Sequence, residues 1–185
     1  MALPQIAVIV GSNRRDSINR KLANALIKLA AGKLDAKIVR IDDLPLYNQD
    51  NEANLPPEVA RFKDEIARAD GILFVTPEHD RSVPAVLKNA VDWGARPFGT
   101  NRWVGKPILI TGTSPGALGT ALAQAHLRQM LGSSLGAHIM GGEAYIAFKP
   151  NLIDDQGNIS DESTQKFLQD FIDRFAAFVG KLAQK

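Results

Sequence analysis

The sequence contains no cysteine. This absence excludes disulfide bonds, iron–sulfur clusters held by thiolates, and catalysis by a thiol. Histidine is scarce as well: His79, His126 and His138 are far apart, and none belongs to a zinc motif such as HExxH. We therefore expect no metal site, and we expect any redox chemistry to depend on a bound organic cofactor.

Long apolar runs and blocks of like charge are also missing. No run approaches the roughly 18 residues that a membrane span requires, and the first residues lack the features of a signal peptide. The net charge is +2, and no basic block or basic stripe with interleaved aromatic residues is present. We therefore expect a cytoplasmic protein that neither spans a membrane nor binds nucleic acid.

The composition is that of an ordinary globular protein, with 45% hydrophobic and 23% charged residues. At this length we expect residues 1–185 to form a single domain. Apolar runs alternate with helical patterns along the chain. The runs predict strands at 5–10, 37–41, 71–76 and 107–111, and a fifth strand bracketed by 138–140 and 144–148. The helical patterns cover 18–32, 58–69, 84–94, 119–131 and 161–182.

This alternation predicts an α/β fold, in which helices cover both faces of a five-stranded parallel sheet. In such sheets, ligands bind beyond the carboxyl ends of the strands, where the strand order reverses. The loops after the first, third and fourth strands are therefore the expected site.

The loop at residues 11–19 (GSNRRDSIN) stands between a strand and a helix. Backbone N–H groups and the dipole favour anions at such a helix N-terminus. The loop is neither a Walker A motif nor the dinucleotide fingerprint, because it has one glycine and no Gly-Lys-Ser/Thr. The alternative is an ordinary connection in which Ser17 is the helix N-cap. Its polar side chains suit a phosphate monoester: Ser12, Arg14 or Arg15, Ser17 and Asn19.

The other two loops suit a flat ring. Residues 77–84 (PEHDRSVP) are made rigid by two prolines, and their N–H groups need partners such as ring nitrogens and carbonyls. The alternative is a helix entry capped by Ser82. Residues 112–119 (GTSPGALG) are small enough to let a ring or phosphate approach the backbone, although small residues are common in such loops.

Two motifs together form a specific pattern: GSxRxxSxN at 11–19 and PExxxSxPxxLKNAxDW at 77–93. In these motifs the chain resembles the NADPH-dependent FMN reductase family, and within it the bacterial chromate and quinone reductases. The resemblance extends over nearly the whole chain. It implies a three-layer, flavodoxin-like fold, noncovalent FMN, and assembly into homodimers or homotetramers through the helices near 84–95 and 119–131.

The resemblance also implies roles for individual residues. Relatives commonly have Tyr-Asn where this chain has His79 and Asp80, so side-chain contacts to the ring would differ here. The Asp80 carboxylate would disfavour reduction of the flavin unless Arg81 compensates its charge. No residue is singled out as catalytic, because the flavin performs the chemistry. The implied FMN-binding residues are Ser12, Arg14, Ser17 and Asn19 at the phosphate, Pro77, Glu78, His79, Asp80 and Ser82 beside the ring, and Ser114 and Gly116 along its other edge.

The function implied is an FMN-dependent oxidoreductase that passes electrons from NADPH or NADH to a quinone, and also to chromate or other oxidised anions. Arg81 and Arg102 are candidates to attract an anionic acceptor. One alternative is a flavodoxin-type electron carrier, which the basic pI near 8.9 and the Pro-Glu motif argue against. The other alternative is an FMN-binding regulatory module without turnover.

Overall fold

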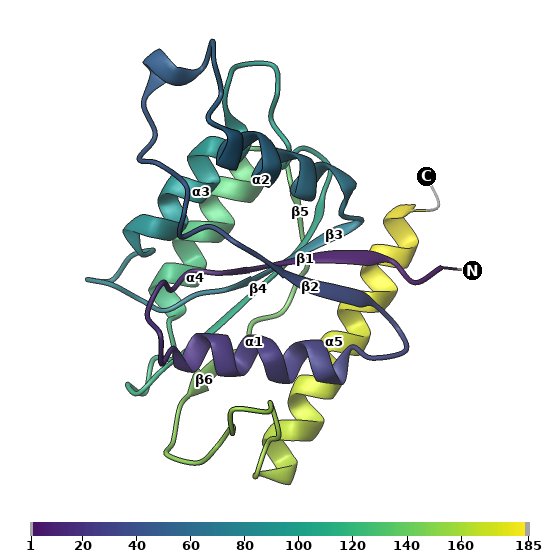
Figure 1. Ribbon diagram of the computed structural model, residues 1–185. Helices are drawn as coiled ribbons and strands as arrows, with labels where there is room; N and C mark the ends of the chain where they lie inside the picture. Colours follow the sequence, from purple (N-terminus) through teal and green to yellow (C-terminus); the bar gives the residue numbers. More distant parts are fainter. Residues whose placement is uncertain (1, 184–185) are drawn as a thin grey trace.

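The computed structural model describes residues 2–183, which alternate between strands and helices from one end to the other (Figure 1). The strands are β1 (Gln5–Val10), β2 (Asp35–Val39), β3 (Gly71–Val75), β4 (Pro107–Ser114), β5 (His138–Ile139) and β6 (Tyr145–Ala147). The α-helices are α1 (Ile18–Leu29), α2 (Pro57–Arg68), α3 (Ala85–Ala95), α4 (Ala121–Arg128) and α5 (Glu162–Ala183). Two short helices complete the set: the 3-10 helix η1 (Gln49–Asn51) and the π-helix η2 (Gln129–Ser134), which continues α4.

The sheet has the strand order β2-β1-β3-β4-β5, and β6 also pairs with β4. Its strand pairs are parallel, with Val8 of β1 opposite Ile38 of β2 on one side and Leu73 of β3 on the other. The order reverses at β1, so the carboxyl ends of β1 and β3 form the switch point at which ligands bind in open α/β sheets. This is the predicted flavodoxin-like α/β fold.

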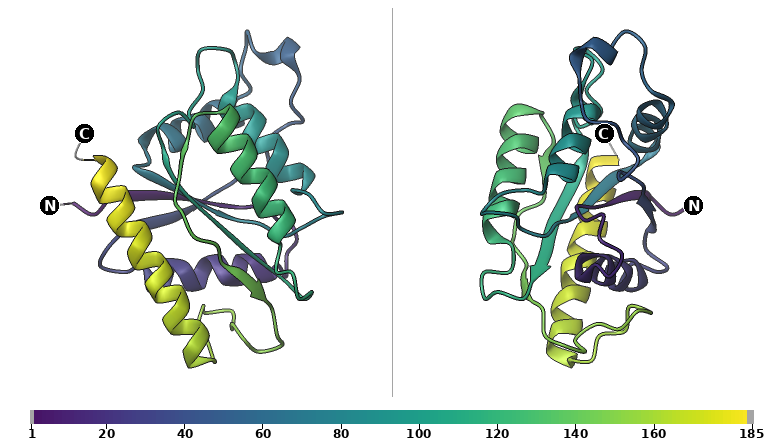
Figure 2. Two further views of the ribbon diagram at one scale, coloured as in Figure 1. Left: turned by 180° about the vertical axis from the view of Figure 1, so that it is seen from behind. Right: turned by 60° about the vertical axis from the view of Figure 1, so that its left-hand side comes forward.

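Helices cover both faces of the sheet, which makes three layers (Figures 1 and 2). Because side chains alternate along a strand, Ile6 and Val8 of β1 pack with α1 and α5, while Ala7 and Ile9 pack with α2 and α3. The residues of β3 are buried throughout, as expected for a strand covered on both faces. Among the helices of residues 2–183, none is long and apolar enough to cross a membrane.

Several boundaries differ from the sequence prediction. β2 lies two residues earlier than expected, at 35–39, and α1 ends at Leu29 before a turn in which Gly32 has a φ of 78°. The predicted fifth strand consists of two short strands, which pair with different halves of β4. Because β6 pairs with residues 112–114, β4 continues to Ser114 where a loop was expected.

Candidate functional site

The first loop ends at Ser17, which is the N-cap of α1. Its hydroxyl oxygen accepts a hydrogen bond from the backbone N–H of Arg20 at 3.2 Å, so the capping alternative is confirmed for this residue. The first turn of α1 holds no acidic side chain. Its Arg20 N–H also donates to the Ser17 carbonyl at 3.0 Å, so the N–H groups of Ile18 and Asn19 are the ones that a helix start leaves without a carbonyl partner. Ser12 and Arg14 lie just before it, with the Ser12 hydroxyl 3.4 Å from the Arg14 N–H. This helix end retains the character of an anion site.

Asn19 has a role that sequence reasoning missed. Its side chain is buried, and its amide bonds both backbone groups of Thr113: Nδ2 donates to the carbonyl at 2.9 Å, and Oδ1 accepts from the N–H at 3.0 Å. The β3 ladder reaches only to Thr111, where the Thr76 N–H donates to the carbonyl of Thr111. The Asn19 amide thus bonds Thr113 on the edge of β4 that faces β3, where the next residue of β3 would otherwise pair. It joins the start of α1 to the end of β4.

The second loop forms a tight hairpin turn. His79 and Ser82 exchange two backbone hydrogen bonds, of 3.0 and 2.9 Å. Between them, Asp80 and Arg81 have φ values of 49° and 64°, which is the pattern of a type I′ turn. Aspartate tolerates this left-handed conformation, whereas for arginine it stores strain of about 1 kcal/mol. Both side chains are exposed at the tip.

Glu78 connects this turn to α4. Its Oε2 accepts hydrogen bonds from the N–H groups of Leu122 and Ala123, at 3.0 and 3.2 Å. Thr120, the N-cap residue itself, makes no side-chain capping bond, so Glu78 caps the helix from outside. The guanidinium of Arg81 lies 3.5 Å from the other carboxylate oxygen of Glu78. Arg81 is the charge that the sequence offers to compensate Asp80; its ion pair in the structure is with Glu78.

Ser82 is not the cap of α3. That helix begins after Pro84, which occupies the N-cap position without a side-chain bond. The Ser82 hydroxyl instead lies 3.0 Å from Nδ1 of His126 on α4. His126 was absent from the predicted site, because no sequence pattern shows which side chains of α4 meet this loop.

The third loop follows β4. Ser114 ends the strand, and its hydroxyl donates to the carbonyl of Gly116 at 3.3 Å. Gly116 is exposed and open, since a Cβ there would meet nothing closer than the Ser114 hydroxyl. Gly112 is the opposite case, because a Cβ there would lie 2.0 Å from the carbonyl oxygen of Thr76. Thus Gly112 allows the ends of β3 and β4 to pack closely, while Gly116 faces outward.

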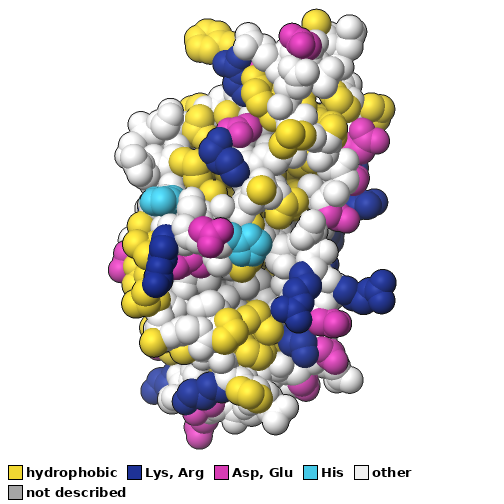
Figure 3. Space-filling view, turned by 90° about the vertical axis from the view of Figure 1, so that its left-hand side faces the viewer, with side chains coloured by type: hydrophobic (Ala, Val, Ile, Leu, Met, Phe, Trp, Pro, Cys, Tyr) yellow, Lys and Arg dark blue, Asp and Glu magenta, His cyan; other side chains and the backbone are white. Residues whose placement is uncertain are grey.

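All three loops lie at one edge of the sheet, because the carboxyl ends of parallel strands meet there (Figure 1, left). Figure 3 views this edge, where a pale area of backbone and other side chains is bordered by acidic, basic and histidine side chains and, below, by a hydrophobic patch. The structure thus brings the predicted residues to a common edge. Three of them, Asn19, Glu78 and Ser82, bond other parts of the protein.

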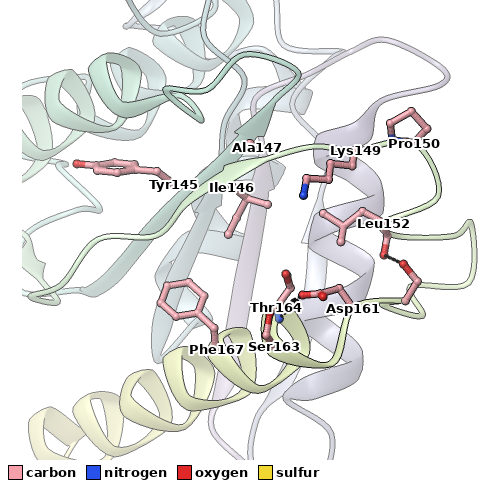
Figure 4. Close-up of a pocket in the computed structure, with 11 residues that line it drawn as sticks. Tyr145, Ile146, Ala147, Lys149, Pro150, Leu152, Asp161, Ser163, Thr164 and Phe167 are labelled. Atoms are coloured by element: carbon pink, nitrogen blue, oxygen red, sulfur yellow. Dashed lines mark hydrogen bonds between the residues drawn. The ribbon is translucent and has the colours of Figure 1, made fainter.

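A separate cavity of about 600 Å³ lies between β6, the segment 149–161 and the start of α5 (Figure 4). Asp161 caps α5 there, accepting from the N–H of Thr164 and the hydroxyl of Ser163, both at 2.7 Å. These hydrogen bonds, from Thr164 above all, lower the pKa of Asp161 to about 2. The Asp161 carboxylate already accepts the hydrogen bonds that cap α5. None of the predicted FMN-binding residues lines this cavity.

Lys63 is another residue with a shifted pKa, and it also lies outside the three loops. Its buried ammonium donates to the carbonyls of Trp93, Gly94, Arg96 and Thr100, at 2.5–3.4 Å. Burial lowers its pKa to about 8. Since its contacts hold the segment after α3, we assign it a structural role.

Comparison with known proteins assigns this chain to a family. The sequence profile of the NADPH-dependent FMN reductases matches residues 4–151. The chain belongs to this family. It is 51% identical to the 2-hydroxy-1,4-benzoquinone reductase of Burkholderia sp over 180 residues, 97% of each chain. It is also 51% identical to a quinone reductase of Pseudomonas putida over 175 residues, 94% of each chain.

A solved structure agrees with this family assignment. FerB of Paracoccus denitrificans, described as a flavoenzyme NAD(P)H:(acceptor) oxidoreductase, superimposes with a TM-score of 0.93. It is 46% identical to the chain, and the match covers 97% of this chain and 98% of FerB. Both sequence motifs, at 11–19 and 77–93, lie within the region that the family profile matches.

Proposed function

We propose that this chain is an FMN-dependent NAD(P)H:quinone reductase. The observation that supports the proposal is the meeting of three loops at the carboxyl edge of the sheet, next to the switch point: a helix start without acidic side chains, a tight turn and an open glycine-containing loop. Relatives that are half identical over almost the whole chain and are named quinone reductases support the substrate class.

The residues at this edge fit FMN. The start of α1 offers N–H groups with no acidic side chain among them, and Ser12 and Arg14 add a hydroxyl and a positive charge. We propose that Ser12, Arg14 and Ser17 hold the phosphate. We further propose that the peptide groups of residues 77–82 border the ring on one side, with Ser114 and Gly116 on the other. When bound, FMN supplies the two-electron chemistry between NAD(P)H and the acceptor.

The protein's own part is binding and positioning. Asn19 sets the distance between the phosphate end and the ring end by holding α1 against β4. Glu78 holds the turn against α4 through its carboxylate, which is not free to act as an acid or base. We therefore propose no catalytic side chain.

For the acceptor, the edge offers both apolar and charged contacts. Leu118 is 52% exposed beside the ring loop and suits a flat, neutral quinone. Arg81, whose side chain is 67% exposed, is the residue that favours an oxidised anion such as chromate. Arg102, expected at the same rim, precedes β4 and lies near Lys63 and Lys106, toward the opposite edge of the sheet. Anion reduction therefore depends on Arg81, and its kcat/KM should fall with ionic strength more steeply than that for a quinone.

The test uses purified protein loaded with FMN. NADPH oxidation with 1,4-benzoquinone is followed without any added reductase, and FMN and riboflavin affinities are measured by fluorescence quenching. We expect steady-state turnover, and much tighter binding of FMN than of riboflavin, which lacks the phosphate. A protein that binds FMN without turnover is a carrier or a regulatory module, and equal affinity for the two flavins contradicts the phosphate site.

We also propose a homodimer or homotetramer in which α3 and α4 face another copy. Between these helices lies a cavity of about 510 Å³, lined among others by Val83 and Met130. Light scattering at micromolar concentration tests this, and a monomer of 20.1 kDa would contradict it.

A further inference from the structure

α4 contacts the turn of residues 79–82 at two points, one on each side of its tip. Before the tip, Glu78 accepts from the N–H groups of Leu122 and Ala123. At the end of the turn, the Ser82 hydroxyl contacts Nδ1 of His126. Residues 122 and 126 are separated by about one helical turn, so they lie on the same face of α4. A single stretch of helix therefore holds both ends of the turn.

These anchors matter because the turn between them is strained. Asp80 and Arg81 both have positive φ, a conformation that arginine seldom adopts. A strained segment persists only where its surroundings hold it, and such segments are concentrated at ligand sites. The pair of backbone hydrogen bonds between His79 and Ser82 closes the turn but does not fix it to the body of the protein. The contacts of Glu78 and Ser82 with α4 attach the turn to the body of the protein.

We propose that His126 is a positioning residue of the cofactor site, which acts through Ser82 to hold the strained turn in the conformation that borders the FMN ring. This rests on the proposed function. His126 reaches the turn from outside the family motif at residues 77–93, and its imidazole is itself exposed. A hydroxyl both donates and accepts, so the contact is retained in either neutral tautomer of the imidazole and in the imidazolium.

The exposed position of His126 allows matched variants that leave the core intact. His126→Asn retains a polar atom where Nδ1 stands, whereas His126→Gln places its polar group near the position of Nε2. His126→Leu retains the bulk but removes the hydrogen bond. His138→Leu is the control, because His138 is an exposed histidine on β5, which pairs with the opposite end of β4.

The first experiment uses protein without cofactor, so its outcome is independent of any flavin chemistry. Amide hydrogen exchange of His79 and Ser82 is measured by NMR, because these two N–H groups close the turn. We expect exchange to accelerate roughly twofold to tenfold in His126→Leu and His126→Gln, the range that one ordinary hydrogen bond supports. His126→Asn and His138→Leu should match the wild type. Unchanged exchange in His126→Leu overturns the proposal.

The second experiment asks whether the anchor serves FMN. FMN dissociation constants are compared for His126→Leu, Ser82→Ala and the double variant. We expect each single change to raise the FMN dissociation constant roughly twofold to tenfold. The dissociation constant of the double variant should be no higher than the higher of the two single-variant values. Multiplying effects overturn the proposal, because they show that His126 does not act through Ser82. A wild-type protein that binds no FMN refutes the proposed function, whereas the exchange result separately establishes whether His126 holds the turn.

Discussion

Substitution of Asn19 tests whether its side chain joins the phosphate end of the candidate site, at the start of α1, to the ring end, at the end of β4. Asn19→Leu replaces the side chain by one of similar size and removes both hydrogen bonds to Thr113. Thr113 is fully buried, so its N–H and carbonyl lose their partners. Each unpaired buried group costs about 1–3 kcal/mol. Burial of the leucine offsets roughly 1 kcal/mol, so the two unpaired groups leave an expected loss of about 1–5 kcal/mol in the free energy of unfolding.

The assay is thermal and urea unfolding of cofactor-free protein, so that bound FMN does not add to the stability. For a chain of this length the expected loss lowers Tm by about 2–20 °C. Asn19→Asp keeps an acceptor for the Thr113 N–H but cannot donate to its carbonyl, so it should also destabilise the protein. Asn13→Leu, in the exposed part of the same loop, is the matched control and should change stability by less than about 0.5 kcal/mol.

The same variants separate bridging from direct phosphate binding. If Asn19 joins α1 to β4, Asn19→Leu weakens binding of FMN and riboflavin alike, because both ends of the site shift. If Asn19 instead contacts the phosphate, FMN binding weakens, riboflavin binding does not, and stability is unchanged. That second pattern would refute the bridging role.

Three further predictions follow from single contacts. Glu78→Ala should lower the free energy of unfolding of the cofactor-free protein by about 2 kcal/mol, measured by urea unfolding, because α4 loses its cap; a value equal to that of Glu78→Gln would show that the charge is unimportant. Arg14→Ala should weaken FMN binding more than Arg15→Ala, as titration will reveal, and the reverse order would mean that the wrong arginine is assigned. Asp161 has a lowered pKa of about 2, so its stabilising contribution is present above its ordinary pKa of 3.8 and is lost as pH falls toward 2. Stability should therefore fall less between pH 5 and 2 in Asp161→Asn, and parallel pH curves would contradict this.

The fold was predictable because its main determinant is local. Five apolar runs separated by amphipathic helices leave few arrangements other than a doubly wound parallel sheet. The end of β4 was not predictable, since Gly112 and Ser114 read as a loop and become strand only by pairing with residues 145–147. Edge pairing between distant segments leaves no periodic signal in either segment.

The candidate site was likewise predictable in its location but not in its side-chain contacts. The two motifs locate the loops at 11–19 and 77–84, and the small residues of 112–119 after a predicted strand mark the third loop. The parallel sheet brings the three loops together. What each side chain bonds depends on tertiary neighbours, however, so the contacts of Asn19 with Thr113 and of Glu78 with α4 could not be inferred. Arg81 illustrates the limit: no local preference predicts arginine at positive φ, and only the structure reveals it.

The close packing at Gly112 constrains how this protein can change. A methyl group at that position would lie 2.0 Å from the Thr76 carbonyl and 2.5 Å from the Thr120 hydroxyl, so no other residue is tolerated without separating the strands. Substitution of Gly112, at the inner part of the candidate site, is therefore expected to displace the strand ends. Variation is easier at the rim, where the side chains of His79 and Leu118 are exposed and lie outside the core. New acceptor preferences in this lineage should thus arise by substitution at those outer positions while the underlying strand ends stay fixed.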